Sequence, residues 1–143
     1  MHCLETSIEI NTSAERVWSL LMDFAAYPRW NPFVRSIEGA PSVGKPLKVV
    51  IQSPGSGGMR FRPVVLACEA AREFRWKGKL WMAGLFDAEH YFKIEPRSGG
   101  VLFLQGEMFS GLLVPLFRRS LDGATKRGFV LMNEALRREA ENG

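Results

Sequence analysis

Three polar side chains, His90, Gln105 and Glu107, have the types and spacing needed for acid–base chemistry or for holding a polar group of a ligand. His90 alternates in phase with Phe92, and Gln105 and Glu107 alternate in phase with Phe103. Because the apolar side chains on one strand face point into the core, we expect the three polar groups to point inward too. An imidazole and a carboxylate beside an apolar cavity can act as acid and base.

The pairing of the two segments decides which of these groups meet. We expect the turn at residues 96–100 to place Ile94 opposite Val101, a register in which His90 faces Gln105. Buried polar groups need partners, so one alternative is that the three groups only hydrogen-bond one another. A second alternative is that one or more of them lies in water at a cavity mouth.

Aromatic side chains are numerous, with ten Phe and four Trp in 143 residues, and they supply candidate walls for an apolar pocket. Ordinary core packing is the alternative for each of them. We expect Trp81 at the rim, because its strand phase puts it opposite Phe86. Together with the three polar groups, the candidate ligand-contacting residues are Trp30, Phe33, Trp76, Phe86, His90, Phe92, Phe103, Gln105, Glu107, Phe117 and Leu121.

Other patterns that carry chemistry are weak in this chain. His2 and His90 are the only histidines, which is few for a catalytic metal site. The glycine-rich segment 55–58 lacks the strand-to-helix setting of a phosphate loop, so a flexible hairpin is favoured. Ser110 has no Gly-x-Ser-x-Gly elbow around it, so a hydrolase triad is unsupported. We therefore expect neither a metal nor a cofactor.

Length and composition favour one globular domain over residues 1–143. Apolar residues make up 46% of the chain and charged residues 24%, which suits a core that needs no metal or disulfide staples. Cys3 and Cys68 form no CxxC pair, and we expect both to be buried, reduced thiols.

The net charge of +4 is dispersed rather than gathered into a basic block. Acids and bases alternate at i,i+4 spacing along the C-terminal segment, as on a solvated helix face, so we expect no nucleic-acid partner. No apolar run approaches the ~20 residues that cross a bilayer, so we expect no stable membrane insertion. The start lacks a basic segment followed by an apolar run, which favours a cytoplasmic location. Monomer and homodimer both stay open.

Hydrophobic periodicity predicts the order strand, helix, short helix, about six strands and a long helix. A capping box of Thr12 and Glu15 predicts a first helix over residues 13–23. The strands are expected at residues 4–10, 33–38, 47–52, 59–68, 74–80, 82–94 and 101–109.

Two of these elements contain helix or strand breakers. Within 59–68, Pro63 predicts a bulge or a sheet edge, with Val64, Leu66 and Cys68 pointing inward. In the helix over 112–141, the glycines are expected at a bend or at a close approach to the sheet. The apolar stripe of that helix is Phe117, Leu121, Ala124, Gly128, Leu131, Met132 and Ala135, and Gly123 lies beside it.

A meander of this many strands has too much apolar face for one flat layer. We therefore expect an α+β fold in which a curved antiparallel sheet wraps around the long C-terminal helix. Two short helices follow the first strand.

This order, with particular residues inside it, resembles the START/Bet v 1-like superfamily, specifically its bacterial polyketide cyclase/dehydrase and lipid-transport-like branch. The resemblance spans nearly the whole chain. The segments that carry it are residues 12–18 with Asp23, Tyr27-Pro28-Arg29-Trp30-Asn31-Pro32-Phe33, His90-Tyr91-Phe92 and residues 105–111. It implies a helix-grip fold with a deep cavity between the concave sheet and the long helix.

The resemblance also implies three kinds of function, because members bind hydrophobic or aromatic molecules, some catalyse cyclisation or dehydration, and one branch activates a chaperone ATPase. Our first hypothesis is binding or carriage of a small lipid-, quinone- or polyketide-like molecule. The second is a cyclase or dehydratase that uses His90 and Glu107 as acid and base. The third is an interaction protein, which predicts little cavity volume and a sizeable exposed apolar patch.

Overall fold

The computed structural model describes residues 1–55, 57–80, 82 and 84–142, apart from the side chain of Leu80. Trp81, expected at the pocket rim, lies outside the described residues. The strands are β1 (His2–Ile10), β2 (Val34–Gly39), β3 (Leu47–Ile51), β4 (Met59–Phe61), β5 (Val64–Glu69), β6 (Glu73–Leu80), β7 (Phe86–Arg97) and β8 (Gly100–Ser110). The helices are α1 (Ala14–Met22), α2 (Tyr27–Trp30), α3 (Val114–Ser120) and α4 (Lys126–Asn142). A 3-10 turn (Phe24–Ala26) precedes α2, and a π-turn (Leu121–Thr125) joins α3 to α4.

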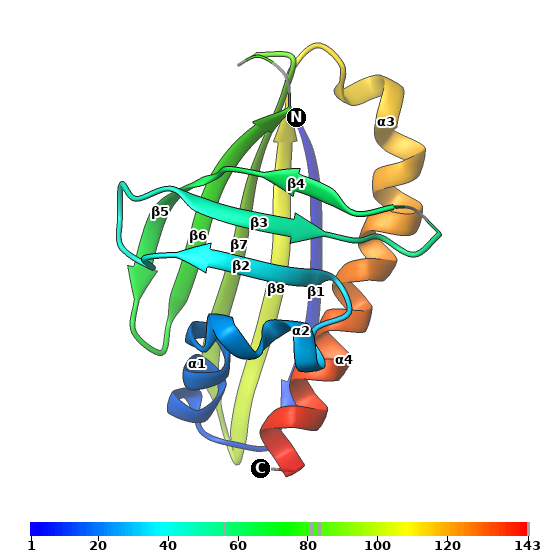
Figure 1. Cartoon of the computed structure of the whole chain (residues 1–143). Coiled ribbons are helices and arrows are strands. Elements are labelled where there is room, and N and C mark those ends of the chain that lie inside the picture. Colours follow the sequence, from blue (N-terminus) through cyan, green and yellow to red (C-terminus); the bar gives the residue numbers. More distant parts are fainter. Residues whose placement is uncertain (56, 81, 83, 143) are drawn as a thin grey trace.

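The strands form two connected antiparallel sheets. The order is β1-β8-β7-β6-β5 in the five-stranded sheet and β2-β3-β4 in the three-stranded sheet. A bridge between Pro46 and Val64, with a 2.8 Å hydrogen bond from the Leu47 amide to the Pro63 carbonyl, connects them. The three-stranded sheet crosses in front of the long strands, and α3 and α4 run along one side (Figure 1). The α+β fold expected from the sequence is confirmed.

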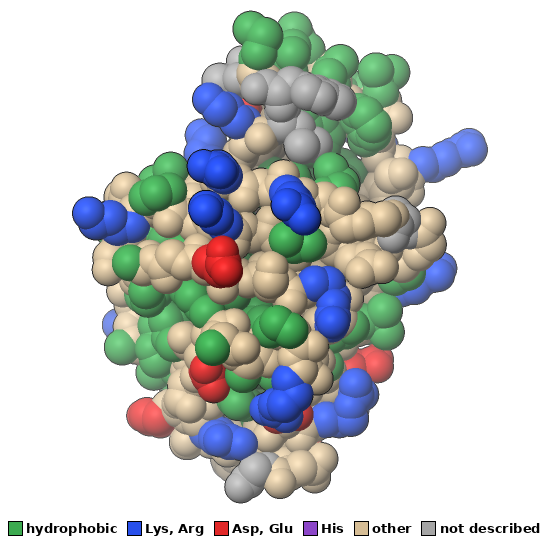
Figure 2. Space-filling view, viewed as in Figure 1, with side chains coloured by type: hydrophobic (Ala, Val, Ile, Leu, Met, Phe, Trp, Pro, Cys, Tyr) green, Lys and Arg blue, Asp and Glu red, His purple; other side chains and the backbone are tan. Residues whose placement is uncertain are grey.

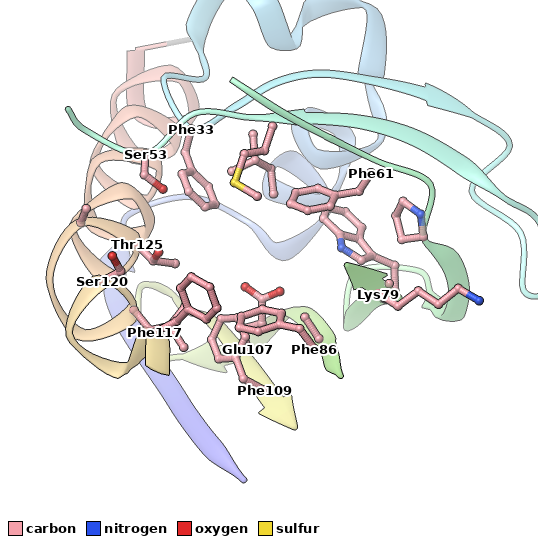
Figure 3. A pocket seen from close by; sticks show the side chains of 18 residues that line it. Phe33, Ser53, Phe61, Lys79, Phe86, Glu107, Phe109, Phe117, Ser120 and Thr125 are labelled. Atoms are coloured by element: carbon pink, nitrogen blue, oxygen red, sulfur yellow. The ribbon is translucent and has the colours of Figure 1, made fainter. Parts of the chain in front are cut away.

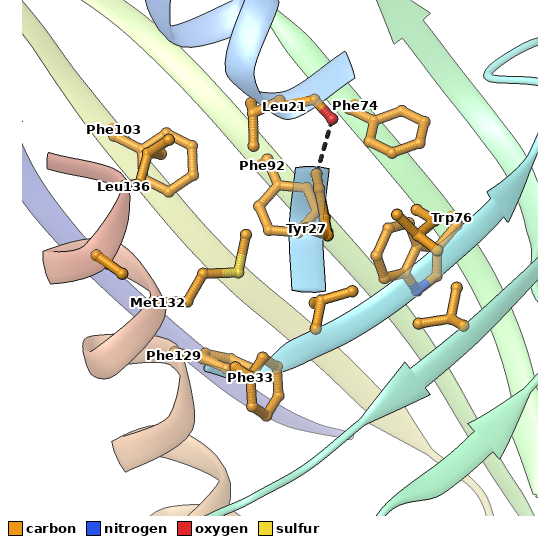
Figure 4. Packing of buried hydrophobic residues seen from close by; sticks show 14 of the residues in the cluster. Leu21, Tyr27, Phe33, Phe74, Trp76, Phe92, Phe103, Phe129, Met132 and Leu136 are labelled. Carbon is orange, nitrogen blue, oxygen red and sulfur yellow. Dashed lines mark hydrogen bonds between the residues drawn. The ribbon is translucent and has the colours of Figure 1, made fainter. Parts of the chain in front are cut away.

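Buried hydrophobic side chains fill the interior where the helices α1, α2 and α4 meet the long strands (Figure 4). Phe92 and Phe103 point inward as expected, with ring centroids 6.1 Å apart. The buried hydroxyl of Tyr27 donates to the Leu21 carbonyl at 2.7 Å, so it has a partner, and burial raises the pKa of this phenol. This part of the interior is filled with side chains.

Two small polar side chains set the ends of the short helices. Ser13 is extended and its hydroxyl accepts from the Arg16 amide at 3.1 Å, so Ser13 is the N-cap of α1. The expected cap at Thr12 is therefore wrong by one residue. Asn31 follows α2, and its side-chain oxygen accepts from the amides of Phe33 and Val34, each at 2.9 Å. This Asx turn starts β2 and directs Phe33 into the interior.

The register of the β7–β8 hairpin differs from the expected one by two residues. Arg97 pairs with Gly100, so the turn is only two residues long, and Gly99 adopts a φ of 82° without strain. As a result Ile94 faces Phe103, and His90 faces Glu107 rather than Gln105. Because side chains alternate with a period of two, this shift changes partners and leaves the inward face unchanged.

The strand after Pro63 has the opposite phase to the expected one at its start. Val65 is buried, whereas Val64 and Leu66 are exposed. The register of β5 on β6 shifts between Val65 and Ala67, so the bulge lies at Leu66 and not at Pro63. Cys68 lies beyond this bulge, where its side chain faces the core as expected.

The two cysteines are free thiols in different environments. Cys68 is half-buried, and burial raises the pKa of its thiol. Cys3 lies on the outward face of β1 and is exposed, so the expectation that both thiols are buried is wrong for Cys3.

The C-terminal helix is interrupted by the π-turn, whose extra residue per turn rotates the buried face of α4 relative to α3. Leu131, expected in the apolar stripe, is therefore exposed, while Phe129, Asn133 and Leu136 are buried. Within the described part of the chain, no helix combines the length and the apolar character required to cross a bilayer.

The two helix glycines have different surroundings. A Cβ added at Gly128 would lie 2.4 Å from Cδ1 of Phe33, a buried ring. A Cβ added at Gly123 would meet no heavy atom within 4 Å. Gly128 is thus required for close approach, and Gly123 lies in the π-turn where the helix is irregular.

We expect Gly128→Ala to lower the free energy of unfolding by about 1–3 kcal/mol, because the new methyl group overlaps the Phe33 ring. Gly123→Ala is the matched control, and its higher helix propensity should leave stability unchanged or raise it by up to about 1 kcal/mol. Urea unfolding of the two variants measures the difference. Equal midpoints would show that the helix does not need glycine at position 128.

Candidate ligand-binding site

A cavity of about 540 Å³ lies where the three-stranded sheet, the long strands and the π-turn meet (Figure 3). Its lining is mostly apolar. The lining residues are Phe33, Ile51, Ser53, Met59, Phe61, Pro63, Trp76, Gly78, Lys79, Phe86, Ala88, Glu107, Phe109, Phe117, Ser120, Leu121, Ala124 and Thr125.

The cavity exists because small residues occupy inward positions there. Gly78 and Ala88 pair with each other in β6 and β7, and both lie on the face that carries large aromatic rings further along the strands. Ala124 of the π-turn is the small residue on the helix side. Glycine and alanine leave unfilled the volume that Phe74, Phe92 and their neighbours fill elsewhere.

Two charged side chains line this cavity, and only one of them points into it. Glu107 lies on the cavity floor between Phe86 and Phe109 with its carboxyl group directed into the space (Figure 3). Lys79 is exposed, and its side chain extends away from the cavity. A polar group of a bound molecule would therefore meet the Glu107 carboxyl group in otherwise apolar surroundings.

His90 lies behind Glu107 and is fully buried. Its Nδ1 is 3.1 Å from Oε1 of Glu107, although the direction of this contact departs from that of a hydrogen bond. The imidazole stacks on Trp76, with ring centroids 5.1 Å apart and planes 18° apart. From the helix side, Phe129 contacts the imidazole edge-on, with ring centroids 5.1 Å apart and ring planes at 78°.

A hydrogen-bond network fixes the proton on the other nitrogen of His90. The amide nitrogen of Gln105 donates to the Phe129 carbonyl at 3.3 Å and to Oδ1 of Asn133 at 2.8 Å. Its oxygen Oε1 then faces Nε2 of His90 at 3.0 Å and can only accept, so Nε2 carries a proton. Asn133 in turn donates to the Thr6 hydroxyl at 2.8 Å, and this hydroxyl donates to the Gln105 carbonyl at 3.0 Å.

With its proton on Nε2, the neutral form of His90 presents the lone pair of Nδ1 on the side of Glu107. Glu107 in turn faces the cavity, so the imidazole lies directly behind the carboxyl group that a bound molecule would meet. An imidazole and a carboxyl group placed in this way have the residue types and the proximity for acid–base chemistry on a group in the cavity.

The structure divides the expected site residues into two groups. Six line the cavity: Phe33, Trp76, Phe86, Glu107, Phe117 and Leu121. The other five are buried and are not part of its lining: Trp30, His90, Phe92, Phe103 and Gln105.

Several residues of the site were missed from the sequence. Phe109 shares the face of Glu107 two residues further along β8, so the alternation already contained that signal. Asn133 completes the network but was missed because the π-turn shifts the phase of the helix. Met59 and Phe61 come from the short strand β4, whose crossing of the main sheet no local pattern reveals.

Comparisons with known proteins agree with this architecture. Solved structures with the same fold include a START superfamily protein from Mycobacterium smegmatis, at 23% identity over 99% of both chains with a TM-score of 0.71. Another is the Zhui aromatase/cyclase from Streptomyces sp. R1128, at 16% identity over 99% of this chain and 94% of that one with a TM-score of 0.75. A third is the di-domain aromatase/cyclase BexL from the BE-7585A biosynthetic pathway, at 13% identity and a TM-score of 0.80; 98% of this chain matches 50% of BexL.

No curated protein matches the chain. The model of one protein family does match, over residues 1–141, and its description is polyketide cyclase / dehydrase and lipid transport. The resemblance inferred from the sequence is thereby confirmed. With its curved sheet, long C-terminal helix and internal cavity, this chain belongs to the polyketide cyclase / dehydrase and lipid transport family.

Proposed function

We propose that the protein binds a small, mostly apolar molecule and directs one hydrogen-bond donor or cationic group of that molecule at Glu107. The observation that carries this proposal is the carboxyl group of Glu107, which among the described lining residues is the charged group that points into the apolar cavity of about 540 Å³. The family, whose description includes lipid transport, supports an apolar ligand. The contacts are proposed for the six lining residues, with His90 and Gln105 acting through Glu107.

Apolar burial would supply most of the affinity. Each methylene group that leaves water contributes about 0.8 kcal/mol before the entropic cost of association is subtracted. The group at Glu107 would fix the orientation of the ligand and discriminate between head groups. A charge-assisted hydrogen bond is worth about 1.5–3 kcal/mol, whereas a second carboxylate at this position would be repelled.

Head-group preference tests this proposal. We expect decylamine and decanol to change the tryptophan emission of the protein, to which Trp76 in the cavity lining contributes, at lower concentrations than decanoate. In Glu107→Gln the affinity for decylamine should fall about tenfold or more while that for decanol changes little, because only the charge is removed. Fluorescence titrations with the three compounds measure both effects. Tight binding of decanoate by the wild-type protein, unchanged in Glu107→Gln, would exclude the proposed role of Glu107.

Filling the cavity tests its location. Ala124→Phe places a ring in the space beside the π-turn, and we expect binding of decanol to be lost while the fold is retained. Val130→Phe adds the same ring on the exposed side of α4 and should bind decanol like the wild-type protein. The measurement is the same titration, with thermal unfolding as the check on folding. If Ala124→Phe bound decanol normally, the ligand would have to lie elsewhere.

A second candidate function is the acid–base catalysis of a cyclisation or dehydration. The observation that favours it is the 3.1 Å contact between His90 and the cavity-facing Glu107. We expect aromatisation of a linear poly-β-ketone, followed by ultraviolet absorbance, to be faster with the wild-type protein than with buffer. It should fall at least about a hundredfold in Glu107→Gln, since proton transfer by a positioned group contributes 10²–10⁴-fold. Equal rates in both proteins would leave binding without catalysis.

The interaction-protein hypothesis predicted little cavity volume together with a sizeable exposed apolar patch. Exposed apolar side chains do occur at Met82, Leu112 and Leu116. The cavity of about 540 Å³ runs against the other expectation, and we do not propose this function.

A further inference from the structure

An exposed apolar cluster lies at one end of the molecule, beside the cavity wall. We call Met82, Leu112, Leu116 and Phe117 the apolar tip; their exposed fractions are 67%, 80%, 77% and 38%. Hydrogen bonds from Leu112 N to the Gly84 carbonyl and from Leu113 N to the Leu85 carbonyl, at 3.1 and 2.9 Å, hold the two contributing segments together. Figure 2 shows hydrophobic side chains gathered at this end.

The charges around the apolar tip are basic. No Asp or Glu occurs between Glu107 and Asp122, whereas Arg118 and Arg119 follow directly after the tip and are exposed. Asp122 is paired with His2, 2.7 Å away. The carboxylate of Asp87, in the adjoining strand, accepts from the backbone amide of Gly84 at 3.0 Å. The tip therefore combines protruding apolar groups with two adjacent exposed arginines, for which the described part of the chain shows no ion pair.

The apolar tip also borders the cavity. Phe117 lines the cavity and is partly exposed, so this ring stands between the cavity and the solvent. It contacts Phe86 edge-on, with ring centroids 5.5 Å apart. The π-turn that follows, with its open space around Gly123, is an irregular joint between α3 and the firmly packed α4.

We propose that the apolar tip is a docking site for an anionic lipid membrane surface, with Leu112 and Leu116 entering the interface and Arg118 and Arg119 meeting acidic head groups. Charge complementarity selects this occupant over a second copy of the chain. Two tips facing each other across a twofold axis would bring their four arginines together, which repel. Docking here is peripheral, because a short helix with a basic end lies in an interface and does not span it.

The position of the docking site has a consequence for the cavity, and this step rests on the proposed function. With the tip in the interface, Phe117 and the cavity border face the bilayer. An apolar ligand can then pass between bilayer and cavity without entering bulk water, where its transfer is least favourable.

Co-sedimentation with vesicles tests the docking site. We expect the wild-type protein to bind vesicles of phosphatidylcholine with phosphatidylglycerol and to bind pure phosphatidylcholine at least about tenfold more weakly. Leu112→Ser/Leu116→Ser should lose about tenfold or more on the anionic vesicles, since two apolar side chains no longer enter the interface. Arg118→Ala/Arg119→Ala should lose about 25-fold, at roughly fivefold per basic residue, on the anionic vesicles only.

Matched controls come from exposed positions elsewhere on the chain. Val64→Ser/Leu66→Ser removes two exposed apolar side chains from β5, and Arg137→Ala/Arg138→Ala removes two exposed charges near the end of α4. Both should bind like the wild-type protein. Equal losses in a control and its partner variant, or no binding of the wild-type protein to anionic vesicles, would overturn the proposal.

Two further measurements separate the possible outcomes. A concentration-dependent dimer that Leu112→Ser/Leu116→Ser abolishes, seen by sedimentation, would assign the tip to a second copy and overturn membrane docking. Ala124→Phe, in which the cavity is filled, should still bind anionic vesicles. For the wild-type protein, decanol binding without binding to anionic vesicles would therefore refute docking alone, and vesicle binding without decanol binding would refute the proposed ligand site alone.

Discussion

The site depends on the hydrogen bonds of the Gln105 side-chain amide. This one amide links the interior strand β8 to α4 through the Phe129 carbonyl and Asn133. Since the backbone carbonyl can only accept, the orientation of the amide is fixed and its oxygen faces His90. The sheet, the helix and the imidazole are thereby held in one arrangement.

The orientation of the Gln105 amide determines the orientation of the groups that lie between it and the cavity. With a proton held on Nε2, His90 presents Nδ1 to Glu107, and Glu107 presents its carboxyl group to the cavity. The rings of Trp76 and Phe129 exclude water from the imidazole, which strengthens the electrostatic coupling between the pair. A buried network that reaches the cavity through Glu107 would suit recognition of the polar group of a ligand.

The interior is divided into a filled part and a hollow part, and the division follows from side-chain size. Along β6 and β7 the inward positions carry large rings where the helices cover them, whereas Gly78 and Ala88 pair with each other beside the cavity, between Trp76 and Phe86. The π-turn continues the hollow on the helix side with Ala124. Filling the far end with rings gives the domain its core, so the cavity can stay open without a large loss of stability.

The inward faces of β7 and β8 were predictable from the sequence because alternation survives errors of register, whereas the expected face at the start of β5 was wrong. Phe92, Phe103, His90 and Glu107 all point inward as expected, although the short turn at Gly99 shifted their partners by two residues. Helix phase was less predictable: Phe117 and Leu121 were placed correctly, but the π-turn moved Leu131 outward and brought Asn133 inward. The periodic pattern of apolar residues does not indicate that one helical turn contains an extra residue, as the π-turn does.

Non-local packing was the part that the sequence could not supply. The short strand β4 reaches the cavity because its sheet crosses the long strands, and that crossing depends on contacts such as Leu47 with Pro63. Of the five expected ligand contacts outside the lining, Trp30 was proposed as an aromatic side chain, and the four on strands were assigned from their inward direction. Direction is a local property, whereas the boundary between core and cavity depends on the volumes of residues from several elements.

The charge inside the cavity and the charges at the apolar tip have opposite signs. This difference affects how ligand binding and membrane docking would work together. Inside, the acidic group Glu107 favours a donor or a cation; outside, Arg118 and Arg119 favour anionic head groups. A membrane lipid with an acidic head group would thus be held at the surface and repelled from the cavity floor. The proposed ligand has the complementary character, apolar with a neutral donor or a positive charge. The two sites therefore select different molecules from the same interface, so an anionic membrane can serve as a docking surface without competing for the cavity.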